Sequence, residues 1–295
     1  MYAFNLKILP LGYACVPYIT IRTGRKMYSR NTTRTSKRKG VRFYFLLCAQ
    51  LCALFFTCLI PQSMPLRAYA AEMERLSSYT TYYNEEDKGR TKNIQLACKR
   101  IDGIILQAYG EFSFNQTVGK RTRAAGFQDA KIIIDGEFVV GVGGGVCQVS
   151  STLYNAVLLA GLTVTESHPH SLPVSYVPPS RDAMVSSSSD LCVLNAFSTP
   201  VRLSAKAENG VLKISVYGKN GGGRYEIISY ITEEIPPPKP IVKEGKEDKI
   251  LRREKSGLKS ESYLERYVGD ALIERKRLRK DSYAAQQGII VKKIA

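Results

Sequence analysis

Apolar positions repeat with a helical period in two stretches of the chain. In residues 94–106 the apolar side chains recur every three or four positions, which predicts a helix that ends near Asp102-Gly103. In residues 147–161 a second such face precedes Gly161, a typical C-terminal stop. This second face consists of Val149, Leu153, Ala156, Val157 and Ala160. We expect it to form the central helix of the fold.

Shorter apolar runs on both sides of this helix predict strands. Residues 110–119 and 131–144 have strand patterns broken by turns, and Asp135-Gly136 fits a hairpin turn. Further strands fall in residues 191–218, where Asn209-Gly210 is a strong hairpin signal. Four prolines in residues 168–183 exclude regular structure there. The pattern predicts an α+β fold of mostly short antiparallel strands around one central helix.

Composition suggests how the chain is divided into domains. Residues 71–93 are polar and fit an extended lead-in to a main domain over residues 94–232. Residues 233–256 are rich in proline and then in charge, which is typical of a semi-rigid linker. Residues 257–295 show two alternating runs around Gly269-Asp270 and predict a small C-terminal β module.

The N-terminal region explains much of the formal net charge of +17. Residues 1–42 are basic, residues 43–60 carry no charge, and small residues flank Tyr69 at positions 68 and 70. This order predicts a cytoplasmic N-terminus and a transmembrane anchor or signal h-region, with cleavage near Ala70 as the alternative to anchoring. The rest of the chain is then extracytoplasmic. Met27 precedes the basic cluster and is a second possible start.

Charge along the remainder argues against nucleic-acid binding. Residues 71–238 carry 16 basic and 17 acidic side chains, whereas residues 239–295 carry 16 and 9. A nucleic-acid protein concentrates positive charge on its folded domain. The nearly neutral main domain does not fit that class, and the basic C-terminal module instead suits anionic wall polymers or a lipid surface.

Three of the seven cysteines, Cys98, Cys147 and Cys192, follow the apolar run. An odd number leaves at least one thiol unpaired or paired between chains. The three lack CxxC spacing, and the chain has only two histidines, so no structural zinc site is predicted. We also find no phosphate loop, no GxSxG motif and no register for dinucleotide binding, and we expect no cofactor.

Cys147 follows a glycine run and starts the predicted central helix. The partial positive charge of a helix N-terminus stabilises a thiolate and lowers its pKa. Backbone N–H groups around Gly144 and Gly145 can hold a developing oxyanion, and glycine lets a substrate approach closely. Two interpretations stay open, a nucleophile held at a helix start and a small buried hydrophobe behind a tight turn.

His168 and His170 are the two histidines of the chain, and one of them is the expected base for a thiol. The spacing does not choose between them. Other candidates for orienting this base or binding a substrate lie in the same two segments: Gln148, Ser171, Tyr176, Arg181 and Asp182.

At these residues the chain resembles the VanW family of bacterial cell-envelope proteins. The matching blocks are "EFSFNQTVGKRT", "GGGVCQVSSTLYNAVLLAGL", "ESHPHSLPVSYVPPSRDA" and "NGVLKISVYG", in that order. Residues after 257 resemble a small G5-type β extension. The resemblance implies a protein that acts on the cell wall, and some family members are described as L,D-transpeptidases whose proposed nucleophile aligns with Cys147.

The expected function is therefore an exported cysteine L,D-transpeptidase that acts on peptidoglycan stem peptides. Two alternatives remain, a cysteine peptidase of the wall and a non-catalytic wall-binding or antibiotic-resistance accessory protein.

Overall fold

The computed structural model describes residues 73–134, 137–219 and 223–294. The predicted basic N-terminus and apolar run, together with Met27 and Ala70, lie outside the described residues. None of the helices in the described part of the chain combines the length and apolar character needed to cross a bilayer.

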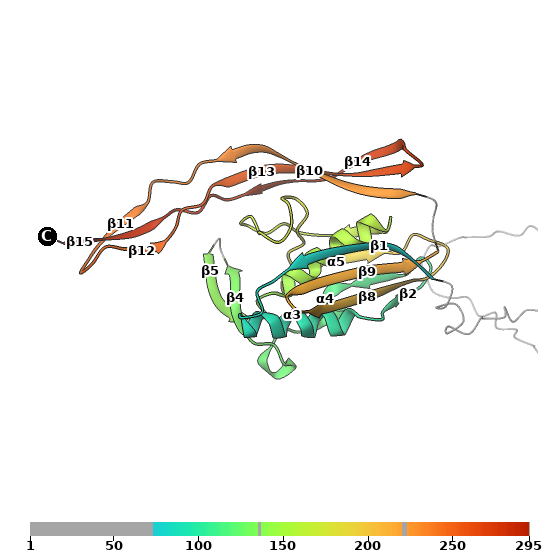
Figure 1. Ribbon diagram of the computed structural model, residues 1–295, viewed down its shortest axis with the longest axis horizontal. Helices are drawn as coiled ribbons and strands as arrows, with labels where there is room; N and C mark the ends of the chain where they lie inside the picture. Colours follow the sequence, from blue (N-terminus) through green and yellow to red (C-terminus); the bar gives the residue numbers. More distant parts are fainter. Residues whose placement is uncertain (1–72, 135–136, 220–222, 295) are drawn as a thin grey trace, which may run out of the picture. The chain divides into compact units, whose positions relative to one another are not determined.

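A four-stranded antiparallel sheet carries the core (Figure 1). Its strands, in spatial order, are β1 (Glu74–Tyr82), β9 (Val211–Gly218), β8 (Val201–Glu208) and β2 (Ile105–Leu106). The predicted turn between β8 and β9 is confirmed, since Asn209 and Gly210 have φ of 52° and 72°. Strand β1 occupies residues that the sequence analysis assigns to an extended lead-in, and it pairs along β9 at the edge of the sheet.

Two helices of 14 residues, α3 (Lys88–Ile101) and α5 (Val146–Leu159), contact each other and the sheet. Helix α3 begins earlier than its apolar spacing predicts because the Asp87 carboxylate accepts a hydrogen bond from the Arg90 N–H at 3.1 Å and caps the first turn. Helix α5 confirms the predicted helix and its stop, where Gly161 has φ of 81°. Two short turns, α4 (Phe114–Val118) and η1 (Arg123–Ala125), follow α3.

Two small antiparallel sheets flank α5. One has the order β3 (Glu111–Ser113), β7 (Cys192–Leu194) and β6 (Thr163–Glu166). The other is the predicted hairpin of β4 (Asp129–Ile134) and β5 (Glu137–Val142), whose turn residues 135–136 lie outside the described residues.

Long strands make up the C-terminal part. The antiparallel sheet of β10 (Arg224–Ile235), β13 (Gly257–Val268) and β14 (Ala271–Tyr283) runs past α5, which contacts β10 (Figure 1). The second sheet holds β11 (Ile241–Gly245), β15 (Ile289–Lys293) and β12 (Lys249–Arg252), with β11 and β15 parallel. The predicted hairpin joins β13 and β14, and Gly269 in it has φ of 58°. Residues 233–256, expected to be a linker, thus contain β11, β12 and the end of β10.

The expectation of mostly antiparallel strands is confirmed, but the fold is strand-rich rather than organised around one central helix. Helix α3 equals α5 in length, because a side-chain cap extends it beyond the apolar spacing. Charged strands also form in the region that composition assigns to a linker and a small module. The division of the chain into domains remains a prediction.

Helix α5 is buried on its polar face as well as its apolar face. The hydroxyl of Ser150 donates to the Ala183 carbonyl at 2.6 Å, and the Asn155 amide donates to the Arg181 carbonyl at 2.7 Å. Because buried polar groups need partners, these bonds fix the proline-containing segment of residues 168–183 along the helix. The segment that carries both histidines is thereby held over the start of α5.

Candidate functional site

Cys147 lies in the first turn of α5, as the sequence predicts. Gly145 is the N-cap residue with φ of 103°, a left-handed conformation that favours glycine. The thiol is half-buried, unbonded to another cysteine, and its Sγ lies 3.4 Å from the Val185 carbonyl oxygen. Cys147 therefore combines a helix N-terminus with partial access to solvent.

Gly144 and Gly145 are buried against neighbouring elements. A Cβ on Gly144 would lie 2.5 Å from the Lys131 carbonyl oxygen, and one on Gly145 would lie 2.9 Å from the Arg90 Cγ. The Gly144 carbonyl also accepts a hydrogen bond from the Asn93 amide at 2.9 Å. The close approach that requires glycine in the structure is to β4 and α3. The approach of a substrate, which the sequence analysis expects, stays a prediction.

His170 and Asp182 form a buried, short hydrogen-bonded pair beside Cys147. The His170 Nδ1 lies 2.6 Å from the Asp182 Oδ2, and the backbone N–H of His170 donates to the same oxygen at 2.7 Å. Both side chains are almost fully buried. The Asp182 carboxylate therefore fixes one ring nitrogen of His170 and leaves Nε2 for the thiol side.

The electrostatics of this group favour a thiolate beside an imidazolium. Burial alone raises the pKa of Cys147, but its hydrogen bond and charge interaction with His170 and the charge of Arg121 lower it below its ordinary 9.0. Burial lowers the pKa of His170, but its interactions with Asp182 and Cys147 raise it to about 9. The pKa of Asp182 falls to about 2, because His170, Arg279 and Tyr283 outweigh its desolvation. Cys147, His170 and Asp182 have the residue types and order of a cysteine catalytic triad.

Two residues of β14 complete the surroundings of Asp182. Tyr283 donates its hydroxyl proton to Asp182 Oδ1 at 2.5 Å, and the Arg279 Nη2 lies 3.0 Å from the same oxygen. They are about one hundred positions from Asp182 in the sequence. No sequence signal connects these two residues with the histidine segment, since they lie in a strand of mostly charged residues.

His168 lies away from the thiol of Cys147 in the contacts of the described residues. Its Nε2 is 2.9 Å from Glu166 Oε1, and the side chain is 40% exposed. Its backbone pairs with Met184 in an isolated bridge. The geometry thus favours His170 over His168 as the partner of Cys147, a choice that the sequence leaves open.

The other predicted residues divide between this site and the scaffold. Tyr176 faces it, since burial and the nearby Cys147 thiol hold the pKa of its hydroxyl well above the usual range. Gln148 belongs to the scaffold: its side chain is buried, its amide N–H donates to the Tyr82 carbonyl at 2.8 Å, and its amide oxygen accepts from Arg90 at 2.6 Å. Arg181 points elsewhere, donating to Asn155 at 2.8 Å with its guanidinium 5.2 Å from the Tyr79 ring centre. Ser171 is exposed, and its carbonyl accepts a hydrogen bond from the Ala284 N–H.

Arg121 is a third site residue that sequence reasoning missed. Its guanidinium donates to Asn115 at 2.5 Å, and it lowers the pKa of Cys147 by its charge. Burial lowers the pKa of Arg121 itself, although Cys147 and Asp190 favour its charged form. The signal that existed was its position within the "EFSFNQTVGKRT" block.

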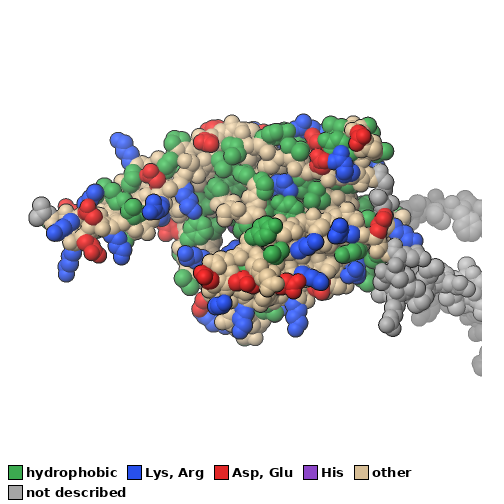
Figure 2. Space-filling model, viewed as in Figure 1, with side chains coloured by type: hydrophobic (Ala, Val, Ile, Leu, Met, Phe, Trp, Pro, Cys, Tyr) green, Lys and Arg blue, Asp and Glu red, His purple; other side chains and the backbone are tan. Residues whose placement is uncertain are grey.

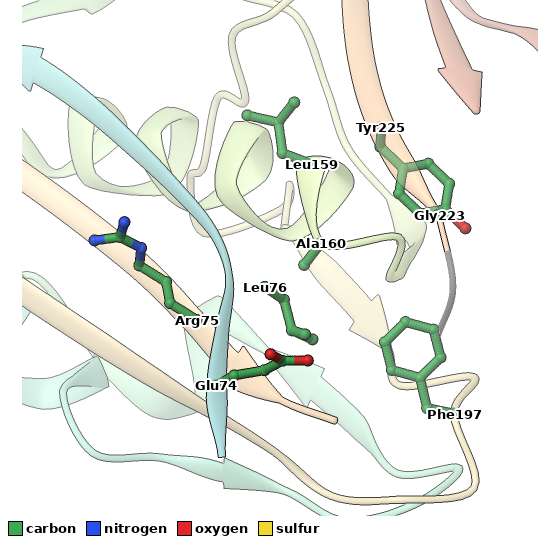
Figure 3. Close-up of a pocket in the computed structure, with 8 residues that line it drawn as sticks. All are labelled: Glu74, Arg75, Leu76, Leu159, Ala160, Phe197, Gly223 and Tyr225. Carbon is green, nitrogen blue, oxygen red and sulfur yellow. The ribbon is translucent and has the colours of Figure 1, made fainter. Parts of the chain in front are cut away.

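A pocket lies at the opposite end of α5 (Figure 3). Leu159 and Ala160 at the helix end, Leu76 of β1 and Tyr225 of β10 contribute to its walls. A helix of 14 residues spans about 20 Å, so this pocket is separate from the Cys147 site. Within the described residues, no three His, Cys, Asp or Glu side chains are grouped as metal ligands.

The fold and this site define a strand-rich protein in which a cysteine, a histidine and an aspartate meet at the start of a buried helix. Residues 89–217 match the family model described as VanW like protein. This part of the chain is therefore a VanW-like domain.

Two curated relatives support this assignment. The chain is 42% identical over 173 residues to the uncharacterized protein YoaR of Bacillus subtilis (strain 168), covering 58% of this chain and 55% of the relative. It is 28% identical over 78 residues to the vancomycin B-type resistance protein VanW of Enterococcus faecalis (strain ATCC 700802 / V583), covering 26% of this chain and 28% of that protein. The alignments therefore span about half of the first relative and less of the second.

Two solved structures with G5 domains also match about a quarter of the chain. The IgA1 protease G5 domain structure is 19% identical, and the match covers 24% of this chain and 87% of that chain with a TM-score of 0.18. The crystal structure of HP0197-G5 is 17% identical, and the match covers 24% of this chain and 93% of that chain with a TM-score of 0.15. At these TM-scores the likeness carries no weight for fold or function.

Proposed function

We propose that this chain is an exported cell-wall protein that acts on peptidoglycan stem peptides as a cysteine L,D-transpeptidase. The observation that carries the proposal is the group of Cys147, His170 and Asp182 at the N-terminus of α5. The VanW domain and the resistance function in the name of one relative support the wall as the place of action. The protein would be extracytoplasmic, anchored through residues 43–60 or released by cleavage near Ala70.

In the first half-reaction the Cys147 thiolate attacks the carbonyl carbon of an L,D peptide bond. The carbonyl electrons move to the oxygen, and the backbone N–H of Cys147 at the positive end of α5 stabilises that oxyanion. As the intermediate collapses, the C–N bond breaks and the His170 imidazolium gives its proton to the leaving amine. A thioester on Cys147 and a neutral imidazole remain.

In the second half-reaction an amine from a neighbouring stem attacks the thioester. The His170 imidazole takes a proton from this amine, and the carbon–sulfur bond breaks to release the cysteine as thiolate. Asp182 keeps the ring oriented in both steps through Nδ1. If water replaces the amine, the same site is a peptidase.

Arg121 fits the role of a substrate-carboxylate ligand in this scheme. It is a half-buried cation close enough to Cys147 to lower the pKa of the thiol. Guanidinium groups bind carboxylates in a bidentate manner, and a stem peptide carries such a group. Tyr176, which also faces Cys147, would line the same substrate site.

The alternative of a non-catalytic wall-binding module has weaker support. Figure 2 shows basic side chains interspersed with acidic ones over the strands β11, β12 and β15. Two of these basic side chains are paired, Arg252 with Glu137 and Lys292 with Asp248, and Lys280 of β14 is paired with Glu261. Pairing of this kind reduces the charge that is free for an anionic polymer.

The proposal is tested by incubating the complete chain with disaccharide-tetrapeptide donors and acceptors and analysing the products by mass spectrometry. We expect 3-3 cross-linked dimers and a thioester adduct on the Cys147 peptide, with at least about a thousandfold loss of dimer formation in Cys147→Ala. Cys192→Ala is the matched control, because Cys192 is also half-buried and unbonded to another cysteine. Hydrolysed stems without dimers would indicate the peptidase, and unchanged dimers in Cys147→Ala would exclude Cys147 as nucleophile.

A further inference from the structure

The Asp182 carboxylate is held from two opposite sides by different parts of the chain. Its Oδ2 accepts both hydrogen bonds from His170, whereas its Oδ1 is bound by Tyr283 at 2.5 Å and by Arg279 at 3.0 Å. The carboxylate is fully buried. A carboxylate with both oxygens engaged cannot rotate, so the direction of Oδ2 toward the imidazole depends on the two residues of β14.

Tyr283 is itself fixed by the segment that carries Asp182. The N–H of Ser180 donates to the Tyr283 hydroxyl oxygen at 2.8 Å, and this oxygen in turn donates its proton to Asp182. Ser180 has φ of 58°, an uncommon conformation for a residue other than glycine. The strained backbone directs its N–H at the tyrosine, which leaves the hydroxyl proton for Asp182.

Only one nitrogen of the buried Arg279 guanidinium has hydrogen-bond acceptors among the described residues. Its Nη2 bridges Asp182 and Asp281 at 3.0 Å each, while its Nε and Nη1 are buried without a hydrogen-bond acceptor among the described residues. The guanidinium stacks 5.4 Å from the ring centre of Tyr154 in α5. Burying a cation with unsatisfied nitrogens costs stability, a cost that simple docking of two surfaces does not require.

We propose that Tyr283 and Arg279 are positioning residues for His170, acting through Asp182, and that β14 is thereby an integral part of the Cys147 site. The inference rests on the proposed function, since it assigns a role in the same reaction. Both residues lie outside residues 89–217, which match the VanW family model. The family domain alone would therefore lack half of the support of its own aspartate.

Several charged and titratable groups face this site and set the background for a pH measurement. They come from α5, from the segments before and after it and from β14, and they are Arg90, Arg121, Tyr154, Tyr176, Arg279, Asp281 and Tyr283. Tyr283→Phe removes one hydroxyl and no charge. A change in the titration of Cys147 would then report the geometry of Asp182 and His170.

The experiment measures the rate of iodoacetamide alkylation of the Cys147 peptide against pH in the complete, folded chain, with quantification by mass spectrometry. In wild type we expect the thiolate to form below the ordinary pKa of 9.0. In Tyr283→Phe the Asp182 Oδ1 is held by Arg279 alone, so the carboxylate is less firmly oriented and stabilises the imidazolium less, and the inflection moves up by about one pH unit. Arg279→Lys keeps the charge but loses the bridge to both aspartates, and it should move the inflection in the same direction.

Ser260→Ala is the control that separates positioning from docking. Ser260 lies in β13, opposite Asp281 of β14, and its hydroxyl is 2.6 Å from that of Ser180, so its loss weakens the contact of the histidine segment with the same sheet without touching Asp182. We expect comparable loss of thermal stability in Ser260→Ala and Tyr283→Phe, with the inflection moved only in Tyr283→Phe. Equal movement in both, or none in Tyr283→Phe and Arg279→Lys, would overturn this inference alone. A wild-type inflection at or above 9.0 would instead remove the proposed function, and with it the inference.

Discussion

The molecule holds two clusters built from the same residue types, and they differ in the order of their members. In the Cys147 cluster, His170 stands between the cysteine and the carboxylate of Asp182. In the Cys192 cluster, the Glu166 carboxylate stands between the cysteine and His168, with Oε2 at 3.6 Å from the Cys192 Sγ and Oε1 at 2.9 Å from the imidazole.

This difference in order reverses the behaviour of the two thiols. The imidazole beside Cys147 is a proton acceptor, and together with other neighbours it lowers the pKa of that thiol. Burial and the carboxylates of Asp190 and Glu166 raise the pKa of Cys192 to about 12. Residue composition therefore does not identify a nucleophile, because the immediate neighbour of the sulfur decides whether its anion is stabilised.

The largest expected difference between the clusters is in activity. His170→Gln removes the proposed acid and base and should lower the rate of dimer formation by about 10²- to 10⁴-fold. His168→Gln changes only a half-exposed pair with Glu166 and should alter the rate less than about threefold. Rates from the tetrapeptide assay test this pair of variants, and a larger loss in His168→Gln would exchange the roles of the two histidines.

The carboxylates should differ in their effect on stability. Asp182→Asn removes one of the two anionic partners of the buried Arg279 and the anionic partner of His170, which we expect to cost about 3 kcal/mol in urea unfolding. Glu166→Gln affects an exposed pair and should cost less than about 1 kcal/mol.

The cost of Asp182→Asn should also depend on pH. The folded-state pKa of Asp182 is lowered from 3.8 to about 2, so its stabilisation is fully present above 3.8 and is lost as the pH falls through about 2. The difference between wild type and Asp182→Asn should therefore persist at pH 7 and shrink below pH 3.8. A difference that grows on acidification would contradict an ionised Asp182.

The two thiols should also differ in reactivity at neutral pH. Both are half-buried, so access alone does not favour either of them. Because the pKa of Cys147 lies below 9.0 and that of Cys192 at about 12, we expect iodoacetamide to modify Cys147 at least about tenfold faster at pH 7. Peptide mass spectrometry of the folded chain measures both rates together. Equal rates would mean that the neighbouring groups do not control these thiols.

Much of the Cys147 cluster was predictable from local pattern. The glycine run and the apolar period after it place Cys147 at a helix start, and the structure has α5 from Val146. The histidine segment was also apparent. Its spacing could not choose between His168 and His170, because side chains two positions apart lie on the same face of an extended segment.

The rest depends on contacts that a local pattern does not encode. Strand β1 is polar and was missed, since its hydroxyls bond to α5, as Ser77 does to the Ala156 carbonyl at 2.6 Å. Arg279 and Tyr283 belong to a strand with charged outer positions, and only tertiary pairing of β14 with the histidine segment brings them to Asp182. A polar or charged segment can therefore form a strand against its sequence propensity when a residue distant in the sequence satisfies its polar groups.

The smallest expected effect tests whether the Cys192 thiol is unreactive because carboxylates, and not a histidine, are its immediate neighbours. Glu166→Gln removes one of the two carboxylates that face Cys192 and should lower the pKa of its thiol. Asp190 remains, with Oδ2 at 3.7 Å from the sulfur, so the thiol should still titrate above 9.0 and its alkylation at pH 8 should rise only about threefold. Glu234→Gln, at an exposed position of β10, serves as the control. A rise that reaches the rate of Cys147 would mean that a single carboxylate, rather than the absence of an adjacent base, separates the two thiols.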